Sequence, residues 1–242
     1  MEKELAIPYY LQIAETIRSR ILEGHYIPGD LIPSYQELEK EFSVSNITIR
    51  KAIEILVRDG IINRKRGVGT IVSEIDSEII TFELNGNLQR LRDSAEKIPL
   101  TIEVLEITTT FCPSRVQQIL SIDPTKQVWR MKKIRKHKDT IMSYYINYSD
   151  PYWCRKITKN EAEKKRFVDL FRQKSGIQLI RLEQRVEAAV ANLDLSAVLK
   201  VNFGTPLLFV ENIYYSTQDQ PVVLTQIYYR GDRHFYKATA QL

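Results

Sequence analysis

The chain has 242 residues, a net charge of +5 at pH 7, and 43% hydrophobic and 27% charged residues. These proportions are typical of a globular protein rather than a disordered or membrane one. No apolar run approaches the roughly 20 residues that a membrane-spanning helix needs, and the first residues lack the apolar core of a secretory signal. The length allows one large domain or two modest ones. We therefore expect a cytoplasmic protein with no membrane association.

The residues that usually carry catalysis or bind metals are sparse. The two cysteines, Cys112 and Cys154, are too few for a disulfide framework and do not form a C-x-x-C motif. The three histidines are scattered, and no paired carboxylates form a recognisable constellation. We expect no catalytic residue, no metal site and no cofactor.

The first predicted helix covers residues 9–22, where apolar residues recur at helical spacing, and Gly24 ends it. A turn follows at residues 28–30. Ser34 is a good N-cap, and Glu37, three residues later, completes a capping box, so a second helix begins near Tyr35. Residues 43–45 then make a tight turn.

Ser45 is expected to cap a third helix that ends before Gly60. Its predicted buried set is Ile47, Ile49, Ala52, Ile53, Leu56 and Val57, and its predicted solvent face is Asn46, Thr48, Arg50 and Lys51. Two short β-prone runs, residues 61–64 and 70–72, follow with a glycine-containing tip between them. Two helices joined by a tight turn and followed by a basic hairpin indicate a winged helix-turn-helix, in which the second helix of the pair meets base edges in the DNA major groove.

Charge is sorted along this segment. The segment from Val44 to Val72 contains six basic and two acidic residues, whereas the preceding stretch is acidic. Such a distribution favours neutralisation of DNA phosphates. Ordinary solvated helix charges would explain Arg58 and Glu54 equally well, but they explain the compact run Arg64-Lys65-Arg66 less well. Gly67 and Gly69 allow a close backbone approach at the tip, and a phosphate-binding nucleotide loop is not expected there.

Residues 9–72 resemble the DNA-binding domain of the GntR family of bacterial transcription regulators. The resemblance rests on Tyr10-x-Gln12-Ile13, Gly24, Pro28-Gly29-Asp30, Ile32-Pro33-Ser34, Glu37-Leu38, Phe42-x-Val44-Ser45, Thr48-Ile49-Arg50, Ala52, Leu56, Asp59-Gly60, Ile62 and Gly67-x-Gly69-Thr70. It implies DNA-contacting roles for Ser34, Gln36, Ser45, Asn46, Thr48, Arg50, Lys51, Arg64, Lys65, Arg66 and Gly67.

Two positions depart from the family pattern. Gln36 and Asn46 stand where members usually carry arginine and where the family commonly contacts DNA. Because amide side chains favour adenine, we expect an operator with an A·T pair in place of the usual guanine-containing core. The alternative is that both amides only contact phosphates. Selection of the standard half-site from random DNA would contradict the A·T hypothesis.

Residues 1–72 are expected to form the DNA-binding domain, 73–79 a polar linker and 80–242 a second domain. The second domain has β-prone runs at residues 101–110, 127–137, 140–148, 177–190, 206–216 and 222–229, with helical stretches at 88–95, 159–174 and 194–199. This alternation indicates an α+β domain around an antiparallel sheet.

The second half resembles the UTRA effector-binding domain of the HutC-like branch of the GntR family, whose fold is similar to chorismate lyase. The resemblance rests on Leu105, residues 128–135, Gly176-Ile177, Leu199-x-Val201-x-x-Gly204-x-Pro206-Leu207-Leu208, Tyr214, Gln220-Pro221-Val222 and Tyr229-Arg230-Gly231-Asp232-Arg233. It implies a homodimer and a small-molecule effector that alters DNA affinity.

The family often grips its effector with an Arg-x-Arg pair, which here reads Lys133-Ile134-Arg135, with both cations on one face of a strand. A solvent-facing pair on an edge strand is the alternative. Phosphosugar-binding members carry a Ser and a Tyr where this chain has Arg166 and Val168. They carry one pocket Glu where this chain has Val223 and a second near the position of Tyr144. Because those hydroxyl-accepting carboxylates are missing, we expect a less hydroxylated anionic effector. Its expected contacts are Lys133, Arg135, Tyr144, Arg166 and Tyr229.

The sequence therefore predicts a homodimeric transcription regulator, expected to be a repressor, that binds double-stranded operator DNA and answers to a small anionic metabolite. A DNA-binding dimer without small-molecule control is the alternative. An enzyme using the lyase-like fold is a further one, for which the sequence offers little support.

Overall fold

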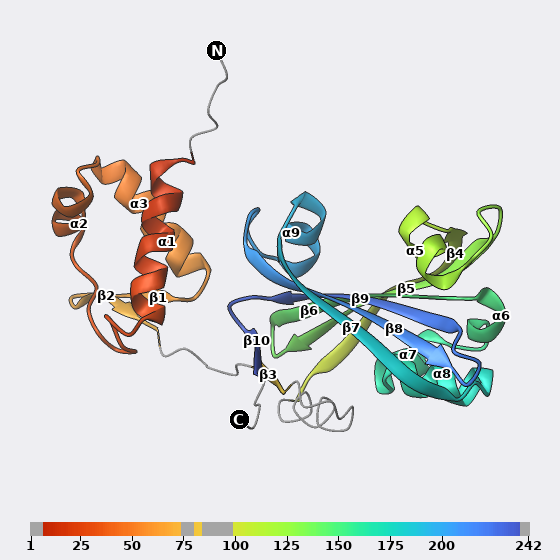
Figure 1. Cartoon of the computed structure of the whole chain (residues 1–242). Helices are drawn as coiled ribbons and strands as arrows, with labels where there is room; N and C mark the ends of the chain where they lie inside the picture. Colours follow the sequence, from red (N-terminus) through yellow and green to blue (C-terminus); the bar gives the residue numbers. More distant parts are fainter. Residues whose placement is uncertain (1–6, 74–79, 84–98, 238–242) are drawn as a thin grey trace, which may run out of the picture. The chain divides into compact units, whose positions relative to one another are not determined.

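The computed structural model describes residues 7–73, 80–83 and 99–237. The chain divides into two compact units, Met1–Ser77 and Glu78–Leu242, and each is described by itself (Figure 1). Most of the predicted linker, residues 74–79, and the helix predicted at residues 88–95 lie outside the described residues.

The first unit contains three helices and a hairpin among its described residues. They are α1 (Tyr9–Leu22), α2 (Tyr35–Phe42), α3 (Asn46–Arg58), β1 (Ile62–Lys65) and β2 (Gly69–Val72). The two strands pair antiparallel, with Ile62 opposite Val72. One core holds the unit together, and residues such as Ile17, Leu38 and Ile53 are almost completely buried in it. The predicted winged helix-turn-helix is confirmed.

The capping box at the start of α2 is present. The Ser34 hydroxyl accepts a hydrogen bond from the Glu37 backbone N–H, and the Glu37 carboxylate accepts one of 2.7 Å from the Ser34 N–H. Ser45 occupies the N-cap of α3, but its hydroxyl lies 3.0 Å from that of Thr48 and makes no capping bond. Ile47, predicted to be buried, is 60% exposed.

Replacing Ser34 with alanine is expected to lower the stability of the first unit by about 1 kcal/mol, because one backbone N–H of α2 loses its acceptor. A urea melt of the full chain followed by circular dichroism measures this change. Ser45→Ala is the matched control: that hydroxyl satisfies no backbone donor, so a loss as large as that of Ser34→Ala would contradict the interpretation.

The second unit is built on a six-stranded antiparallel sheet with the order β4-β5-β6-β9-β8-β7. The strands are β4 (Thr101–Phe111), β5 (Gln127–His137), β6 (Thr140–Ser149), β7 (Leu179–Val190), β8 (Pro206–Ser216) and β9 (Pro221–Arg230). A short parallel pair, β3 (Ile80–Glu83) and β10 (His234–Lys237), stands apart from this sheet. The predicted α+β class and antiparallel sheet are confirmed.

Helices lie on both faces of the sheet (Figure 1). They are α5 (Ser114–Leu120), α6 (Pro151–Cys154), α7 (Lys159–Lys164), α8 (Phe167–Ser175) and α9 (Leu193–Leu199). Figure 1 shows α5 and α9 on one side and α7 and α8 on the other. Phe167 and Phe171 of α8 pack with Trp129 of β5 in the core beneath α8.

The single helix predicted at residues 159–174 is wrong: two helices, α7 and α8, occupy that stretch. Lys165 has extended backbone angles (φ −129°, ψ 156°), and α8 begins after Arg166. The break brings Phe167 into the core, where its ring stacks 5.4 Å from that of Trp129. Helices α5 and α6 were not predicted; the four residues of α6 are too few to show helical periodicity.

Candidate functional site

The exposed face of α3 is the candidate base-reading surface. The buried side of this helix is formed by Ile49, Ala52, Ile53 and Leu56. Arg50 and Lys51 are exposed, as predicted, whereas Asn46 and Thr48 are half-buried. Ile47 joins the exposed face and was missed as a contact residue; its helical angle, almost opposite to that of Ile49, was the available signal. An exposed isoleucine here can contact a thymine methyl group.

Asn46 is held by two protein side chains. Its amide nitrogen donates a short hydrogen bond to the Glu39 carboxylate of α2, and its amide oxygen accepts one of 2.6 Å from Arg50 Nε. The Arg50 guanidinium carbon also lies 5.9 Å from the centre of the Tyr35 ring. Both ends of the amide that we expected to read adenine are therefore engaged within the domain.

The start of α2 and the start of α1 flank this face. Gln36 is exposed in the first turn of α2, next to the capping box of Ser34. The Lys51 ammonium lies 5.7 Å from the centre of the Tyr10 ring, which orients it as a cation–π partner. The predicted contact residues of α2 and α3 thus lie within one folded unit, in a helix-turn-helix arrangement that suits the major groove.

The hairpin carries the predicted basic wing. Arg64, Lys65 and Arg66 are all exposed, and no ion pair involves them within the described part of the chain. Gly67 has a φ of +77° and turns the tip. Exposed cations on a narrow hairpin are suited to DNA phosphates or to a groove edge.

Gly69→Ala is expected to destabilise the wing by about 1–3 kcal/mol, because Gly69 has a φ of +130° and an added Cβ would lie 2.9 Å from Leu31 Cδ2. Thermal melting and DNA affinity of the full chain test this. Gly24→Ala is the control, since Gly24 shares a positive φ of +82° but has no atom within 4 Å of the added Cβ. If the two variants lost equal stability, the steric contact with Leu31 would not contribute.

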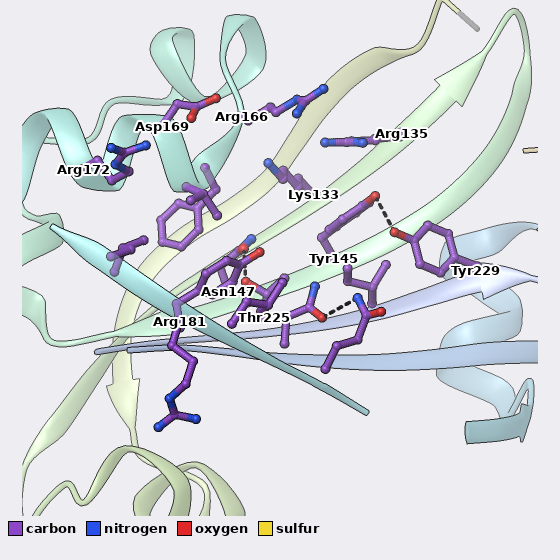
Figure 2. Close-up of a pocket in the computed structure, with 18 of the residues that line it drawn as sticks. Lys133, Arg135, Tyr145, Asn147, Arg166, Asp169, Arg172, Arg181, Thr225 and Tyr229 are labelled. Atoms are coloured by element: carbon purple, nitrogen blue, oxygen red, sulfur yellow. Dashed lines mark hydrogen bonds between the residues drawn. The ribbon is translucent and has the colours of Figure 1, made fainter. Parts of the chain in front are cut away.

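The second unit contains a cavity of about 200 Å³ between α8 and one face of the sheet. Strands β5, β6, β7, β8 and β9 all contribute side chains to its wall. Figure 2 shows Lys133, Arg135 and Arg166 together at one end, whereas Arg181 points away from them. The lining also includes apolar side chains, such as Phe167 and Leu182.

Lys133 is the most unusual residue of the cavity. It lies on β5, between β4 and β6, and is only 1% exposed, so the alternative of a solvent-facing pair on an edge strand is wrong. Its Nζ lies 5.6 Å from the centre of the Tyr145 ring, and the second cation, Arg135, acts on it electrostatically. Burial, and secondarily the charge of Arg135, lowers the pKa of Lys133 to about 7. No ion pair with a carboxylate involves Lys133 within the described residues.

Hydrogen-bond donors without acceptors gather here. Arg135 Nε and Asn147 Nδ2 are buried and have no hydrogen-bond partner. Asn147 Oδ1 accepts a bond of 3.1 Å from the Thr225 hydroxyl, which fixes the amide orientation and leaves the NH₂ group unpaired. Asn147 and Thr225 were not predicted as site residues. The available signal was spacing: Asn147 lies two residues from Tyr145 on β6, and Thr225 two residues from Ile227 on β9. Such alternation identifies the face toward the cavity only once the pairing of the strands is known.

Tyr144 was predicted to line this site, and the structure contradicts the prediction. Tyr144 lies on the opposite face of the sheet, in the core beneath α9, and its ring is 6.3 Å from that of Tyr228. Tyr145 is the residue opposite Lys133 and lines the cavity. The physical reason is a β-bulge between Arg135 and Lys136, which shifts the register by one residue and exchanges the two faces of β6.

The other two predicted contacts reach the cavity. Tyr229 of β9 places its hydroxyl 3.2 Å from that of Tyr145, and burial raises its pKa well above the ordinary value. Arg166 is the N-cap residue of α8 and lines the same end as Lys133. Asp169, in the first turn of α8, is the one carboxylate among the described lining residues. The charged side chains of the lining are thus mostly cations.

In the described ranges, no helix is long and apolar enough to cross a membrane. The same ranges contain no group of three or more histidine, cysteine, aspartate or glutamate side chains arranged to hold a metal ion.

Comparison with known proteins identifies a known domain around each of the two candidate sites. Residues 9–72 match the pattern of the bacterial regulatory proteins of the gntR family, and residues 96–234 match the UTRA domain. The mannosyl-D-glycerate transport/metabolism system repressor MngR of Escherichia coli is 28% identical over 201 residues, covering 83% of this chain and 82% of MngR. The transcriptional repressor NagR of Bacillus subtilis is 22% identical, covering 98% of this chain and 96% of NagR.

Solved structures show the same fold. The possible transcriptional regulator YydK of Bacillus subtilis superposes with a TM-score of 0.57 at 22% identity, covering 97% of this chain and 100% of YydK. PhnF of Mycobacterium smegmatis also gives a TM-score of 0.57, at 20% identity, covering 95% of this chain and 98% of PhnF. The relatives are named as regulators and not as enzymes. The chain belongs to the GntR family, in its HutC-like branch, and is a DNA-binding transcription regulator with a UTRA ligand-binding domain.

Proposed function

We propose that this regulator is a homodimeric repressor whose affinity for its operator is set by a small anion bound in the cavity beside α8. The observation that carries the proposal is a set of buried donors without acceptors, Arg135 Nε and Asn147 Nδ2, in the same cavity as the buried cation Lys133. Buried polar groups are nearly always satisfied, so such a set points to a ligand rich in acceptors. Repressor names among the relatives support the direction of control.

The donors also define the chemical class. An oxyanion such as a phosphate, phosphonate or carboxylate suits the end formed by Lys133, Arg135 and Arg166. A heavily hydroxylated ligand would need acceptors, and Asp169 is the one carboxylate among the described lining residues. Apolar lining residues such as Phe167 and Leu182 suit a ligand body with few hydroxyl groups.

A dimer explains how a ligand can control DNA binding. Two helix-turn-helix units of a symmetric dimer meet half-sites about one helical turn apart, so the operator is expected to be pseudo-palindromic. An effector that changes the separation of the two α3 helices lowers affinity without touching DNA. We propose that this dimer acts in the cytoplasm, in keeping with its role on DNA.

The test is a thermal-shift screen of the full chain against phosphosugars, phosphonates and small carboxylates. A ligand that binds only the folded state raises the melting temperature by mass action. We expect at least one compound to do so, with the shift lost in Arg135→Ala. Arg181→Ala is the matched control, because Arg181 borders the cavity but pairs with Asp219 at 2.5 Å.

A second measurement connects the ligand to DNA. An operator is selected from random DNA, and its affinity is measured with and without the compound that shifts melting. A several-fold change in affinity supports the proposal. A compound that binds through Arg135 yet leaves operator affinity unchanged would contradict effector control and favour a DNA-binding dimer without it.

A further inference from the structure

The side chains between α2 and α3 form a chain of contacts that ends at an exposed arginine. Glu39 accepts from the Asn46 amide nitrogen, and the Asn46 oxygen accepts from Arg50 Nε at 2.6 Å. The guanidinium carbon of Arg50 also lies 5.9 Å from the centre of the Tyr35 ring. Arg50 itself is exposed on the recognition face.

We propose that Glu39 is a specificity-determining residue: through Asn46 it positions Arg50 to read a guanine, and Asn46 itself does not read a base. This rests on the proposed recognition of operator DNA. Glu39 contacts no base and is a positioning residue, whereas Arg50 makes the base contact.

The hydrogen-bond inventory supports this division of roles. A guanidinium has five N–H groups, and only the one on Nε is used by Asn46. The terminal nitrogens keep the parallel pair of donors that matches O6 and N7 of guanine. The hydrogen bond from Nε to Asn46 and the nearby Tyr35 ring hold the plane of the Arg50 guanidinium. The Arg50 side chain therefore has less conformational freedom to lose when DNA binds.

The same inventory argues against Asn46 as an adenine reader. Bidentate pairing with adenine requires both the amide nitrogen and the amide oxygen of Asn46. Both face protein partners here, Glu39 and Arg50. Reading adenine would break both bonds and would leave the Glu39 carboxylate without its donor in a DNA interface, where a negative charge is unfavourable.

A positioning role of Glu39 can be distinguished from a simple repulsion between its carboxylate and DNA. A carboxylate close to DNA lowers affinity for any sequence, so its removal should strengthen non-specific binding. If Glu39 positions Arg50, its removal should also weaken the preference for one guanine. Opposite changes in affinity and in specificity are not expected of a residue that contributes charge alone.

The experiment is random-site selection with the full-length wild type and five variants, read by sequencing, together with affinity for random DNA. We expect Glu39→Ala and Asn46→Ala to lower the preference for the same guanine about two- to tenfold, the effect of freeing one ordered side chain. Arg50→Ala should lower it roughly 5- to 150-fold at that position. Glu39→Gln keeps an oxygen acceptor for Asn46 and should retain the preference.

Glu41→Ala is the matched control for charge. It removes one carboxylate from the same helix, but its partner is Arg20 of α1. It should leave the guanine preference unchanged. Melting curves of all variants confirm folding, and because Glu39 is half-buried at the surface of α2, we expect its variants to fold.

The outcomes separate the two levels of the argument. If the wild type selects no sequence, the proposed operator recognition fails. If it selects one and Glu39→Ala leaves every base preference unchanged, the positioning role is overturned while recognition stands. Loss of an adenine preference in Asn46→Ala, at a position that Arg50→Ala does not affect, would overturn the role assigned to Asn46.

Discussion

Replacing Lys133 with methionine is expected to raise the melting temperature of the ligand-free protein by about 2–12 °C and to remove its stabilisation by small anions. Lys133 is 1% exposed and has no ion pair with a carboxylate within the described residues. An uncompensated buried polar group costs about 1–3 kcal/mol, and methionine fills a similar space without that cost. For a unit of this size, 1 kcal/mol corresponds to roughly 2–4 °C.

The opposite signs of the two effects make this a strong test. Most substitutions of a fully buried residue destabilise a protein, whereas this one should stabilise it and abolish binding together. Loss of one charge-assisted hydrogen bond, worth about 1.5–3 kcal/mol, corresponds to a roughly 10- to 150-fold weaker affinity. Differential scanning fluorimetry with and without sulfate measures both quantities.

Lys136→Met provides the matched control for Lys133→Met. Lys136 lies on the same strand, is partly exposed and pairs with Glu103 of β4. An exposed ion pair contributes about 0–1 kcal/mol, so this variant should show little change in melting and should keep the response to sulfate. A fall in melting temperature for Lys133→Met, with the response to sulfate retained, would show that Lys133 does not belong to the anion site.

Local signals in the sequence predicted the first unit well. The capping box of Ser34 and Glu37 and the spacing of Ile49, Ile53 and Leu56 depend on residues within one or two helical turns. Such patterns can be interpreted without knowing the rest of the fold. Ile47 was placed wrongly because a hydrophobic residue was taken as a buried one, whereas a DNA-reading face can use an exposed isoleucine.

Side-chain partners across elements could not be predicted in the same way. That Asn46 contacts Glu39 depends on how closely α2 approaches α3 and on which rotamers the two side chains adopt. From the sequence, the amide of Asn46 had the hydrogen-bonding groups to read adenine. The structure supplies the competing partners, which argue against Asn46 as a reader and leave Arg50, a predicted contact from the start.

The effector site shows a second limit, that of strand register. The alternation Lys133-Ile134-Arg135 correctly indicated that both cations share one face of β5. The neighbouring strand could not be aligned to them, because one bulged residue decides whether Tyr144 or Tyr145 is opposite Lys133. Asn147 was missed for the same reason. Residues of one strand are therefore predictable as a set, whereas contacts across strands require the fold.

Affinity for anions is expected to fall as pH rises through about 7, by up to tenfold per pH unit, because Lys133 must be charged to hold an anion. Its pKa in the folded protein is lowered from 10.5 to about 7. Above pH 7 the free site holds a neutral amine, so binding must take up a proton, and its free energy weakens with pH. Sulfate is a suitable probe because it remains a dianion from pH 6 to pH 9.

The other groups facing Lys133 do not reproduce this dependence. Burial raises the pKa of Tyr229, and the pKa of Tyr236 is also raised, so both stay neutral. His234, whose ring centre lies 4.6 Å from that of Tyr229, has its pKa lowered to about 4 by burial and is already neutral at pH 6.

The ligand-free protein should show the matching linkage with the opposite slope. A lysine whose pKa is lowered on folding binds fewer protons in the folded state than in the unfolded state between about pH 7 and 10.5. Stability therefore rises with pH in that window and is lowest, for this group, below pH 7. Comparing wild type with Lys133→Met isolates the contribution, because every other titrating group is common to both. Parallel stability curves for the two proteins from pH 6 to pH 9, together with sulfate affinity independent of pH in the wild type, would show that Lys133 remains charged in the free site and would remove the basis for proton-coupled binding.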